Sequence, residues 1–272
     1  MSKANALIVG LGSVGRGLGY YSMPGNSHLS ALLETKKYQI FGTDKILIQN
    51  SSFTYINWKN LIESDLKFDL IVDCGPSDGR LKRLNILNKI FNPEVLLAEK
   101  PIELDSENLS LELCNKVRLT YPRRCFDSTK FIKEKISNYS VTSINIKYNN
   151  GVFNALSHFF DLLSCWEVDF SKDFVCHNNE EVLIGGKIKI SKYRSSLDVF
   201  DIVIELANSD KLFYKNFGRT IIDNHGVIHS FKELDYRYRI LYSNSNYLDL
   251  PTINEDVKNM SILKKLSEFL DD

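Results

Sequence analysis

The sequence lacks a net charge, because its 34 lysine and arginine residues are balanced by 34 aspartate and glutamate residues. No block of basic residues stands out within that balance, so binding to nucleic acid is not expected. The hydrophobic fraction of 43% is that of an ordinary folded core. We therefore expect a folded protein whose partners are not polyanions.

Cysteine is scarce, and no Cys-x-x-Cys pair is present. The five cysteines are Cys74, Cys114, Cys125, Cys165 and Cys176. An odd number without close pairs indicates reduced, mostly buried thiols rather than a disulfide framework. Four of the histidines also lack the spacing of metal ligands: His28, His177, His225 and His229. No metal site is expected.

Long apolar runs are absent as well. The longest candidate, residues 151–166, is interrupted by polar residues, namely Asn154, Ser157, His158 and Asp161. It is therefore not expected to span a membrane. The N-terminal apolar run leads into glycines, which is not the pattern of a signal peptide. We expect a soluble, cytoplasmic protein.

What is present is a glycine-rich turn after a short apolar run. Residues 6–9 lead directly into Gly10-x-Gly12-x-x-Gly15. In a strand–turn–helix context, such glycines allow a tight reversal, close approach of a pyrophosphate and packing of the next helix. Ser13 and Val14 lie inside the turn, and the helix after it would direct its amides and dipole at the phosphates. The sequence predicts dinucleotide binding; a glycine-rich turn without a ligand is the alternative.

The helix after this turn is expected to be interrupted. Pro24-Gly25 is typical of a turn, and a helix is expected to resume after Ser27 as its N-cap.

An acidic residue follows the next predicted strand, residues 38–43. Asp44 can accept hydrogen bonds from the adenosine ribose, although it lies 29 residues after Gly15 rather than roughly 20. The extra loop accounts for the difference. The carboxylate favours NAD over NADP, and Lys45 beside it weakens that preference; a surface turn acid is the alternative.

Alternating strands and helices continue to about residue 121. Strands are expected at 53–56, 68–74 and 94–98, and helices at 58–64 and 81–90. This alternation predicts a doubly wound parallel sheet of the Rossmann type over residues 1–121. Right-handed crossovers bring the strand-end loops to one edge. The cofactor crevice therefore also receives Gly75, Pro76, Glu99 and Lys100.

Residues 122–272 have a different pattern. Helices are expected at 127–138, 152–166 and 254–270, and strands at 141–148, 181–183, 187–190, 199–206, 212–216, 220–222 and 237–242. This pattern indicates an α+β domain with an open, largely antiparallel sheet.

Four motifs together resemble the glucose–fructose oxidoreductase/inositol dehydrogenase (Gfo/Idh/MocA) family. They are residues 10–15, Glu99-Lys-Pro101, residues 121–124 and Asn154-x-x-Ser-His158-x-x-Asp161. The resemblance covers roughly the first 165 residues. It implies an NAD(P)-dependent oxidoreductase of sugars, cyclitols or nucleotide-linked sugars, with a C-terminal sheet that makes a homodimer or homotetramer.

The resemblance also implies roles for single residues. Lys100 would touch the nicotinamide ribose and a substrate hydroxyl, and its ammonium would stabilise an alkoxide. Pro101 matches a cis-proline turn that would direct the lysine. His158 is the candidate base. Asp161 lies one helical turn beyond it and would orient the imidazole or stabilise local structure.

Further residues are assigned less specific roles. Arg123 and Arg124 would bind a phosphate or carboxylate of the substrate, or else form a solvated pair. Tyr121 is placed with them in the expected substrate-binding set, and a packing residue is the alternative. Asn154 stands where many relatives carry aspartate, and an amide cannot stabilise a protonated imidazole as a carboxylate does.

The leading expectation is an oxidoreductase that uses NAD, with NADP not excluded, on a secondary alcohol of a sugar or nucleotide-sugar. Surface polysaccharide biosynthesis is one expected use. Two alternatives stay open: a redox-neutral, NAD-using glycosidase, and a cofactor-binding structural or regulatory protein without turnover.

Overall fold

The computed structural model describes residues 3–48, 50–102, 110–149, 151–171, 173–178, 180–193 and 198–270. The chain forms two compact units. Unit 1 contains Met1–Pro122 and Asp235–Val257, and unit 2 contains Arg123–Leu234 and Lys258–Asp272. The domain boundary expected after residue 121 takes no account of the segment 235–257, which packs with unit 1.

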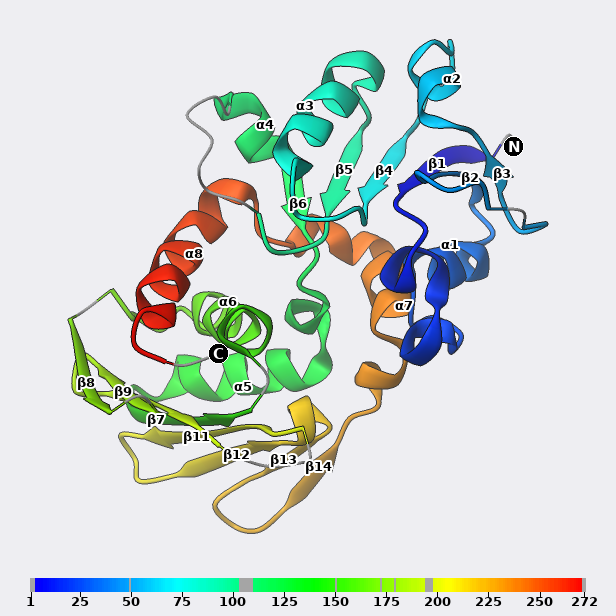
Figure 1. Cartoon of the computed structure of the whole chain (residues 1–272). Coiled ribbons are helices and arrows are strands. Elements are labelled where there is room, and N and C mark those ends of the chain that lie inside the picture. The colour runs from blue at the N-terminus through cyan, green and yellow to red at the C-terminus, as the bar shows by residue number, and fades with distance from the viewer. Residues whose placement is uncertain are drawn as a thin grey trace. The chain divides into compact units, whose positions relative to one another are not determined.

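Unit 1 contains a six-stranded sheet in the order β3-β2-β1-β4-β5-β6 (Figure 1). The strands are β1 (Ala4–Val9), β2 (Tyr38–Thr43), β3 (Thr54–Tyr55), β4 (Leu70–Asp73), β5 (Val95–Ala98) and β6 (Val117–Leu119). All neighbouring pairs are parallel. This strand order, in which the chain reverses direction between β1 and β4, is that of a doubly wound dinucleotide-binding sheet. The predicted fold class of this part is confirmed.

Helices cover both faces of this sheet. They are α1 (His28–Thr35), α2 (Trp58–Ile62), α3 (Arg80–Phe91), α4 (Leu111–Lys116) and α7 (Arg237–Tyr242), with shorter turns η1 (Ser13–Gly17), η2 (Gly19–Ser22), η6 (Glu233–Tyr236) and η7 (Ser243–Asp249). Leu7 and Val9 of β1 pack in one core cluster with Leu84 and Leu87 of α3. Ala6 and Ile8 of β1 are equally buried and point to the opposite face, because side chains alternate along a strand.

The prediction of a strand over 237–242 was wrong. The segment is α7, whose buried residues Tyr238, Leu241 and Tyr242 are spaced i, i+3 and i+4. The amide of Tyr238 donates to the carbonyl of Gly25, at 3.0 Å. Helix α7 packs on α1, so a long-range contact decides its conformation. The short aromatic sequence by itself is compatible with either structure.

Unit 2 contains an eight-stranded sheet in the order β14-β13-β12-β11-β7-β10-β9-β8. The strands are β7 (Val141–Tyr148), β8 (Phe174–Asn178), β9 (Glu181–Ile184), β10 (Ile188–Lys192), β11 (Phe200–Leu206), β12 (Lys211–Lys215), β13 (Thr220–Ile222) and β14 (Ile228–Ser230). Only the β7–β10 pair is parallel. The expected largely antiparallel sheet is confirmed, whereas β8 and β14, like β6 and α4 of unit 1, were not predicted.

One face of this sheet carries helices. They are α5 (Asp127–Asn138) and α6 (Ser157–Cys165), which follows η4 (Gly151–Leu156); η3 (Pro122–Cys125) and η5 (Asn216–Gly218) are shorter turns. In Figure 1, α5 and α6 lie on the same side of the strands. Ile144, Ile146 and Tyr148 of β7 are fully buried, and the intervening Lys147 is exposed. The last helix, α8 (Ile253–Ser267), begins in unit 1 and continues into unit 2.

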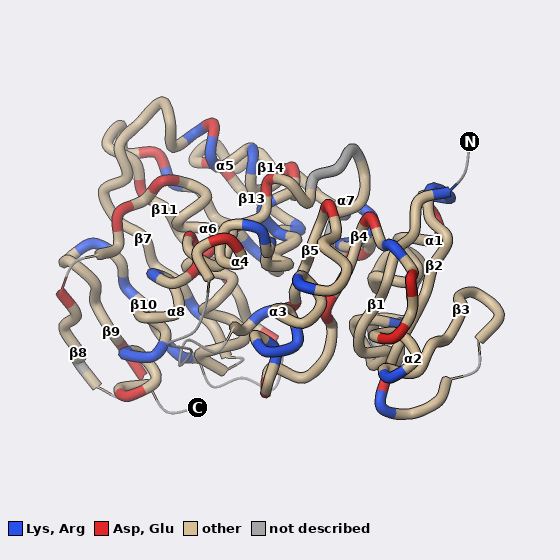
Figure 2. The backbone as a smooth tube through the Cα atoms, turned by 90° about the horizontal axis from the view of Figure 1, so that it is seen from above, with Lys and Arg blue, Asp and Glu red and all other residues tan. Residues whose placement is uncertain are grey.

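Charged residues of both signs are interspersed over both units, as Figure 2 shows. Within the described ranges, the helices are too short or too polar to cross a lipid bilayer.

Candidate functional site

Strand β1 ends in a turn that two glycines make possible. Gly10 has a φ of +87°, and a Cβ added there would lie 2.6 Å from the nitrogen of Gly75. A Cβ on Gly15 would lie 2.1 Å from the carbonyl oxygen of Gly10. A Cβ on Gly12, in contrast, would meet nothing within 4 Å. Gly10 and Gly15 therefore form the turn, while Gly12 keeps open the space that a pyrophosphate would need.

The helix after this turn is short. It is the single π-helical turn η1, which ends at Gly17; Gly17 and the nearby Gly19 both have positive φ. The regular helix starts only at α1, where the Ser27 side chain accepts a hydrogen bond from the Ser30 amide, as expected of an N-cap. The predicted interruption is confirmed. Because η1 has one turn, its dipole is small, and the expected phosphate binding would depend mainly on the backbone amides of the turn.

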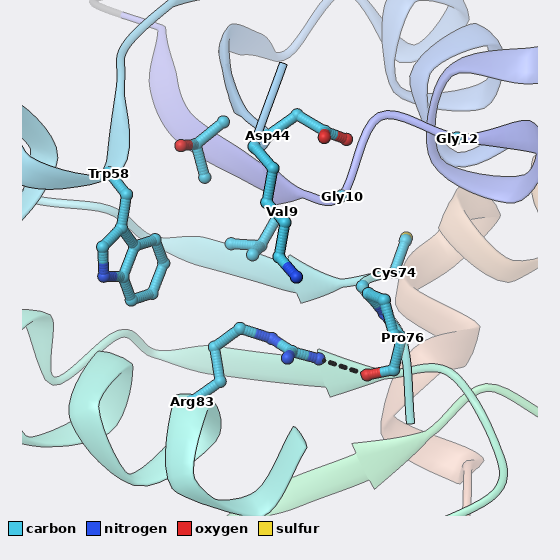
Figure 3. Close-up of a pocket in the computed structure, with 11 residues that line it drawn as sticks. Val9, Gly10, Gly12, Asp44, Trp58, Cys74, Pro76 and Arg83 are labelled. Carbon is cyan, nitrogen blue, oxygen red and sulfur yellow. Dashed lines mark hydrogen bonds between the residues drawn. The ribbon is translucent and has the colours of Figure 1, made fainter. Parts of the chain in front are cut away.

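A cavity of about 620 Å³ lies beside the turn, entirely within unit 1 (Figure 3). It is lined by Val9, Gly10, Gly12, Thr43, Asp44, Lys45, Trp58, Cys74, Gly75, Pro76 and Arg83. Its volume is within the range of small-molecule sites. The structure thus brings together the cofactor residues expected from three separate strand ends. Burial raises the pKa of the Cys74 thiol well above its ordinary value, so this thiol is not an activated nucleophile.

Asp44 is fixed at the edge of this cavity. Its Oδ2 accepts a hydrogen bond from the Leu11 amide at 2.6 Å, and the Tyr55 hydroxyl donates to its carbonyl at 2.9 Å. The carboxylate therefore joins the end of β2 to the glycine turn. Its other oxygen lies 3.4 Å from the Ile46 amide. Contact of Asp44 with a ribose stays a prediction.

Arg83 lines the cavity, and the sequence analysis did not identify it. Its Nε lies 3.1 Å from both carboxylate oxygens of Asp73, and its Nη2 lies 2.9 Å from Asp73 Oδ2. Asp73 ends β4 and is fully buried. Arg80, three residues earlier on α3, donates to the carbonyls of Gly75 and Pro101. The sequence did contain a signal for this contact: Arg80 and Arg83 are three residues apart and follow Asp73, an acidic residue at the end of a predicted strand.

Glu99 forms hydrogen bonds inside unit 1. Its Oε1 lies 2.9 Å from His28 Nε2 and accepts a hydrogen bond from the Tyr238 hydroxyl at 2.8 Å. Burial alone would raise the pKa of Glu99, but hydrogen bonds from His28, Thr120 and Tyr238 lower it below its ordinary value. The carboxylate is therefore ionised and held by the protein. The sequence analysis placed it in the cofactor crevice and did not anticipate these partners.

Lys100 follows Glu99 and is half-buried in unit 1. The Lys100–Pro101 peptide bond is cis, as the family resemblance implied. His158, the second candidate for proton transfer, is half-buried on α6 of unit 2. Their joint action on one substrate stays a prediction.

Asp161 is paired within unit 2. Its Oδ1 accepts a hydrogen bond from Arg124 Nε at 2.6 Å, and the carboxylate is almost completely buried. The pair connects α6 with the turn η3. His158 lies three residues before Asp161 on α6, so both occupy one side of the helix. Asn154 is exposed on η4, and its carbonyl accepts a hydrogen bond from Ser157.

Arg123 and Tyr121 have contacts typical of packing residues. The Arg123 guanidinium lies over the rings of Phe200 and Phe217, at 4.8 and 5.1 Å from their centroids. Its Nη1 donates to the Phe217 carbonyl at 3.0 Å. Tyr121 is fully buried in unit 1, and its hydroxyl donates to Asp256 at 3.3 Å. Contact of either residue with a substrate stays a prediction.

Across the described part of the chain, no three His, Cys, Asp or Glu side chains are grouped as metal ligands would be.

The comparisons with known proteins give matches by structure alone. The sequence matches no family model, and no curated protein matches it. D-galactose-1-dehydrogenase from Rhizobium etli superimposes with a TM-score of 0.67 at 14% identity, over 100% of this chain and 96% of that one. A myo-inositol dehydrogenase from Corynebacterium glutamicum has a TM-score of 0.67 at 12% identity, over 99% of this chain and 97% of that one. The WlbA (WbpB) dehydrogenase from Thermus thermophilus, in complex with NAD and UDP-GlcNAcA, has a TM-score of 0.64 at 14% identity. The match covers 97% of this chain and 94% of that one.

These likenesses extend over nearly the whole length of each chain, including the C-terminal part that sequence motifs did not cover. The six-stranded parallel sheet with its glycine turn and the eight-stranded, largely antiparallel sheet both agree with them. The chain therefore has the two-domain fold of the Gfo/Idh/MocA-type dehydrogenases.

Proposed function

We propose that this protein is an NAD(P)-dependent oxidoreductase acting on a secondary alcohol of a sugar or nucleotide-sugar. The observation that carries the proposal is the cavity at the carboxyl ends of β1, β2 and β4, where Gly12 leaves backbone open to a ligand. In doubly wound sheets, dinucleotides bind at this edge. Solved structures with the same fold include sugar dehydrogenases and one complex with NAD and a nucleotide-sugar.

The preferred cofactor in this proposal is NAD. The Leu11 amide holds the Asp44 carboxylate at the edge of the cavity, where it would face a ribose 2′-phosphate. Repulsion between two anions then disfavours NADP, and Lys45 in the same cavity reduces the effect. When bound, the nicotinamide supplies the hydride acceptor or donor for the carbinol carbon.

Lys100 and His158 are the proposed groups for proton transfer. An ammonium at Lys100 would stabilise the oxygen of the alcohol as it becomes an alkoxide, and the imidazole of His158 would accept the proton. Asp161, which is held by Arg124, would limit the orientations open to α6 side chains near His158. Asn154 would contact the substrate from η4. Specificity for the sugar would come from unit 2.

The proposal includes a homo-oligomer formed through the sheet of unit 2. On the face away from α5 and α6, Val203 and Phe213 are only partly exposed, and the two residues are directly paired across β11 and β12. Salt bridges surround them, such as Lys215–Asp201 and Lys211–Glu205. An apolar centre with a charged margin is typical of an interface.

A cytoplasmic location and a role in surface polysaccharide biosynthesis complete the proposal. The five cysteines are all free, which is expected in a reducing compartment. The polysaccharide role is supported only by the nucleotide-sugar in the WlbA complex.

Calorimetric titration with NAD and NADP, followed by turnover assays, tests the proposal. The purified protein is mixed with NAD and a panel of UDP-linked and free sugars, and reduced nicotinamide is followed by absorbance. We expect binding of NAD, turnover of at least one sugar and loss of turnover in K100M with NAD binding retained. Absence of dinucleotide binding would refute the proposal, and full activity of K100M would refute the role of Lys100. NAD recovered unchanged after sugar cleavage would indicate a redox-neutral glycosidase instead.

A further inference from the structure

Lys100 lies just beyond the point where the backbone ladder of β5 ends. The carbonyl of Ala98 accepts hydrogen bonds from the amide of Thr120 at 2.9 Å and from its hydroxyl at 3.2 Å. The Glu99 amide donates to the Asp73 carbonyl at 2.9 Å. These bonds fix the chain up to the residue before Lys100. Any further restraint on the direction of the lysine has to come from side chains that hold its two neighbours.

Arg80 holds the residue that follows Lys100. It is 4% exposed on α3, where its Nη1 donates to the Pro101 carbonyl at 2.6 Å and its Nη2 donates to the Gly75 carbonyl. Its Nε lies 3.9 Å from Asp73 Oδ2, which balances the charge. One guanidinium therefore joins the loop after β4 to the loop after β5.

Stability alone is a poor explanation for a buried arginine at this place. Taking a cation out of water costs free energy, and apolar residues of similar volume often stabilise a fold equally well. The carboxylate of Asp73 is bound more closely by Arg83, whose Nη2 lies 2.9 Å from Oδ2. What Arg80 adds is a fixed separation between two backbone carbonyls, because its guanidinium is planar and rigid. Its position is thus better explained by the geometry of the two loops.

Glu99 holds the other side of Lys100. Its Oε1 lies 2.9 Å from His28 Nε2 and accepts a hydrogen bond from the Tyr238 hydroxyl at 2.8 Å. Burial raises the pKa of Tyr238 well above its ordinary value, so the hydroxyl keeps its proton and can donate. His28 is fully buried, and its second ring nitrogen contacts the Tyr242 hydroxyl. The orientation of the Glu99 side chain is therefore set by α1 and α7.

We propose that Arg80, His28 and Tyr238 are positioning residues that together fix the direction of the Lys100 side chain. They act through the two residues that flank Lys100, Arg80 from α3 and the other two from α1 and α7. The inference rests on the proposed proton transfer by Lys100 and extends it to three buried side chains. Displacement of a reacting group by about 1 Å can lower a rate about a hundredfold, so this restraint would have a large effect on turnover.

The reactivity of the Lys100 amine tests the proposal without any substrate. The protein is treated with a trace of acetic anhydride at several pH values, and acetylation of Lys100 is measured by mass spectrometry. Lys82, which is exposed on α3, is the internal reference. In R80M and H28F, the pH profile of Lys100 should shift towards that of Lys82, because a released amine would be solvated as Lys82 is. H28Q, whose amide can still reach Glu99, should keep the profile of the wild type.

Turnover gives a second readout, measured with NAD and the panel of UDP-linked and free sugars. Y238F retains the ring that packs on His28 and loses the hydroxyl that donates to Glu99. Its kcat should fall about tenfold or more, while the dissociation constant of NAD, measured by calorimetry, should stay within about twofold. R80K keeps the charge, but a single nitrogen cannot replace the two that bind separate carbonyls, so kcat should also fall.

S30A is the matched control for a loss of stability. Ser30 and Ser27 form the reciprocal cap of α1, and the Ser30 hydroxyl donates to the Ser27 carbonyl at 3.2 Å. S30A should lower the melting temperature and leave both the acetylation profile of Lys100 and kcat unchanged. The same changes in S30A as in H28F would show that they follow stability in general, and would overturn the proposal. If R80M or H28F does not fold, R80K and Y238F carry the test.

The outcomes separate this proposal from the proposed function. If NAD binds and a sugar is turned over, but the acetylation profile and kcat are unchanged in R80K, R80M, H28F and Y238F, the positioning role is overturned and the proposed function stands. If neither NAD nor NADP binds, the proposed function fails. The acetylation profiles then decide by themselves whether these residues orient Lys100.

Discussion

His28 Nε2 lies 2.9 Å from Glu99 Oε1 inside unit 1, and the other ring nitrogen of His28 lies 2.5 Å from the hydroxyl of Tyr242. His28 is fully buried at the start of α1. The Tyr238 ring packs on the imidazole, with centroids 4.3 Å apart, and its hydroxyl donates to the same oxygen of Glu99. This cluster connects the end of β5, directly before Lys100, with α1 and with α7.

Replacing His28 should reduce the stability of the fold, and the loss should be larger in the variant that loses more of the hydrogen bonds of His28. H28F leaves the Glu99 carboxylate and the Tyr242 hydroxyl without this partner, and should lower the free energy of unfolding by about 2–3 kcal/mol. H28Q can still reach Glu99 with its amide and should cost less. Urea denaturation followed by circular dichroism measures both. Equal losses in the two variants would contradict the importance of the Glu99 contact.

Glu99 should make stability depend on acidity. Its folded-state pKa is lowered, so its contribution is fully present above the unfolded pKa of about 4.3 and is lost as the pH falls through the folded value. The isosteric E99Q removes this contribution. The decline of unfolding free energy below about pH 5 should therefore be less steep in E99Q than in the wild type. Denaturation curves at several acidic pH values give this free energy for both proteins. If it fell equally steeply with pH in the wild type and in E99Q, the explanation would be wrong.

Gly12 and Gly15 should respond to alanine in opposite ways. G12A places a methyl group in open space beside the cavity, so the fold should be unaffected and dinucleotide binding should be weakened at least tenfold. G15A forces a Cβ against the Gly10 carbonyl and should destabilise unit 1. Melting curves and NAD titrations of both variants test this contrast. Normal NAD affinity in G12A would show that the ligand does not pass this position.

Asp44 should control the preference between NAD and NADP. D44N keeps an oxygen that can accept the Leu11 amide hydrogen bond but removes the negative charge. The ratio of the dissociation constants for NADP and NAD should fall by about tenfold. Calorimetric titration of the wild type and D44N with each dinucleotide gives the ratio. An unchanged ratio would show that Asp44 does not contact the ribose.

Arg124 and Asp161 should be important for the stability of unit 2. R124A leaves the buried Asp161 carboxylate without this partner and should lower the free energy of unfolding by about 3 kcal/mol. K133A is the control, because Lys133 forms an exposed ion pair with Glu167 and its removal should have no measurable effect. If both substitutions lowered the free energy of unfolding by similar amounts, the buried Arg124–Asp161 pair would stabilise the fold no more than the exposed Lys133–Glu167 pair does.

The parallel sheet and its glycine turn could be predicted from the sequence because the signals are local. Continuous apolar runs such as residues 6–9 require burial on both faces, and the spacing of the glycines specifies the turn. The alternation in β7 and the Ser27 cap were predictable for the same reason. Asp44 was identified from its place after a strand.

The cluster of His28, Glu99 and Tyr238 could not be predicted, because its members are separated by up to 210 residues in the chain. The return of 235–257 to unit 1 has no local signal, and the conformation of α7 depends on that return.

The sequence by itself determined the strand–turn–helix pattern at the N-terminus, and with it the edge of the sheet at which a ligand would be held. Only the tertiary structure decided which side chains line that edge, since Trp58 and Arg83 come from α2 and α3, and neither carries a motif. The physical reason is that backbone turns depend on neighbouring residues. The lining of a cavity, in contrast, depends on how distant segments pack, and that packing has no local pattern in the chain.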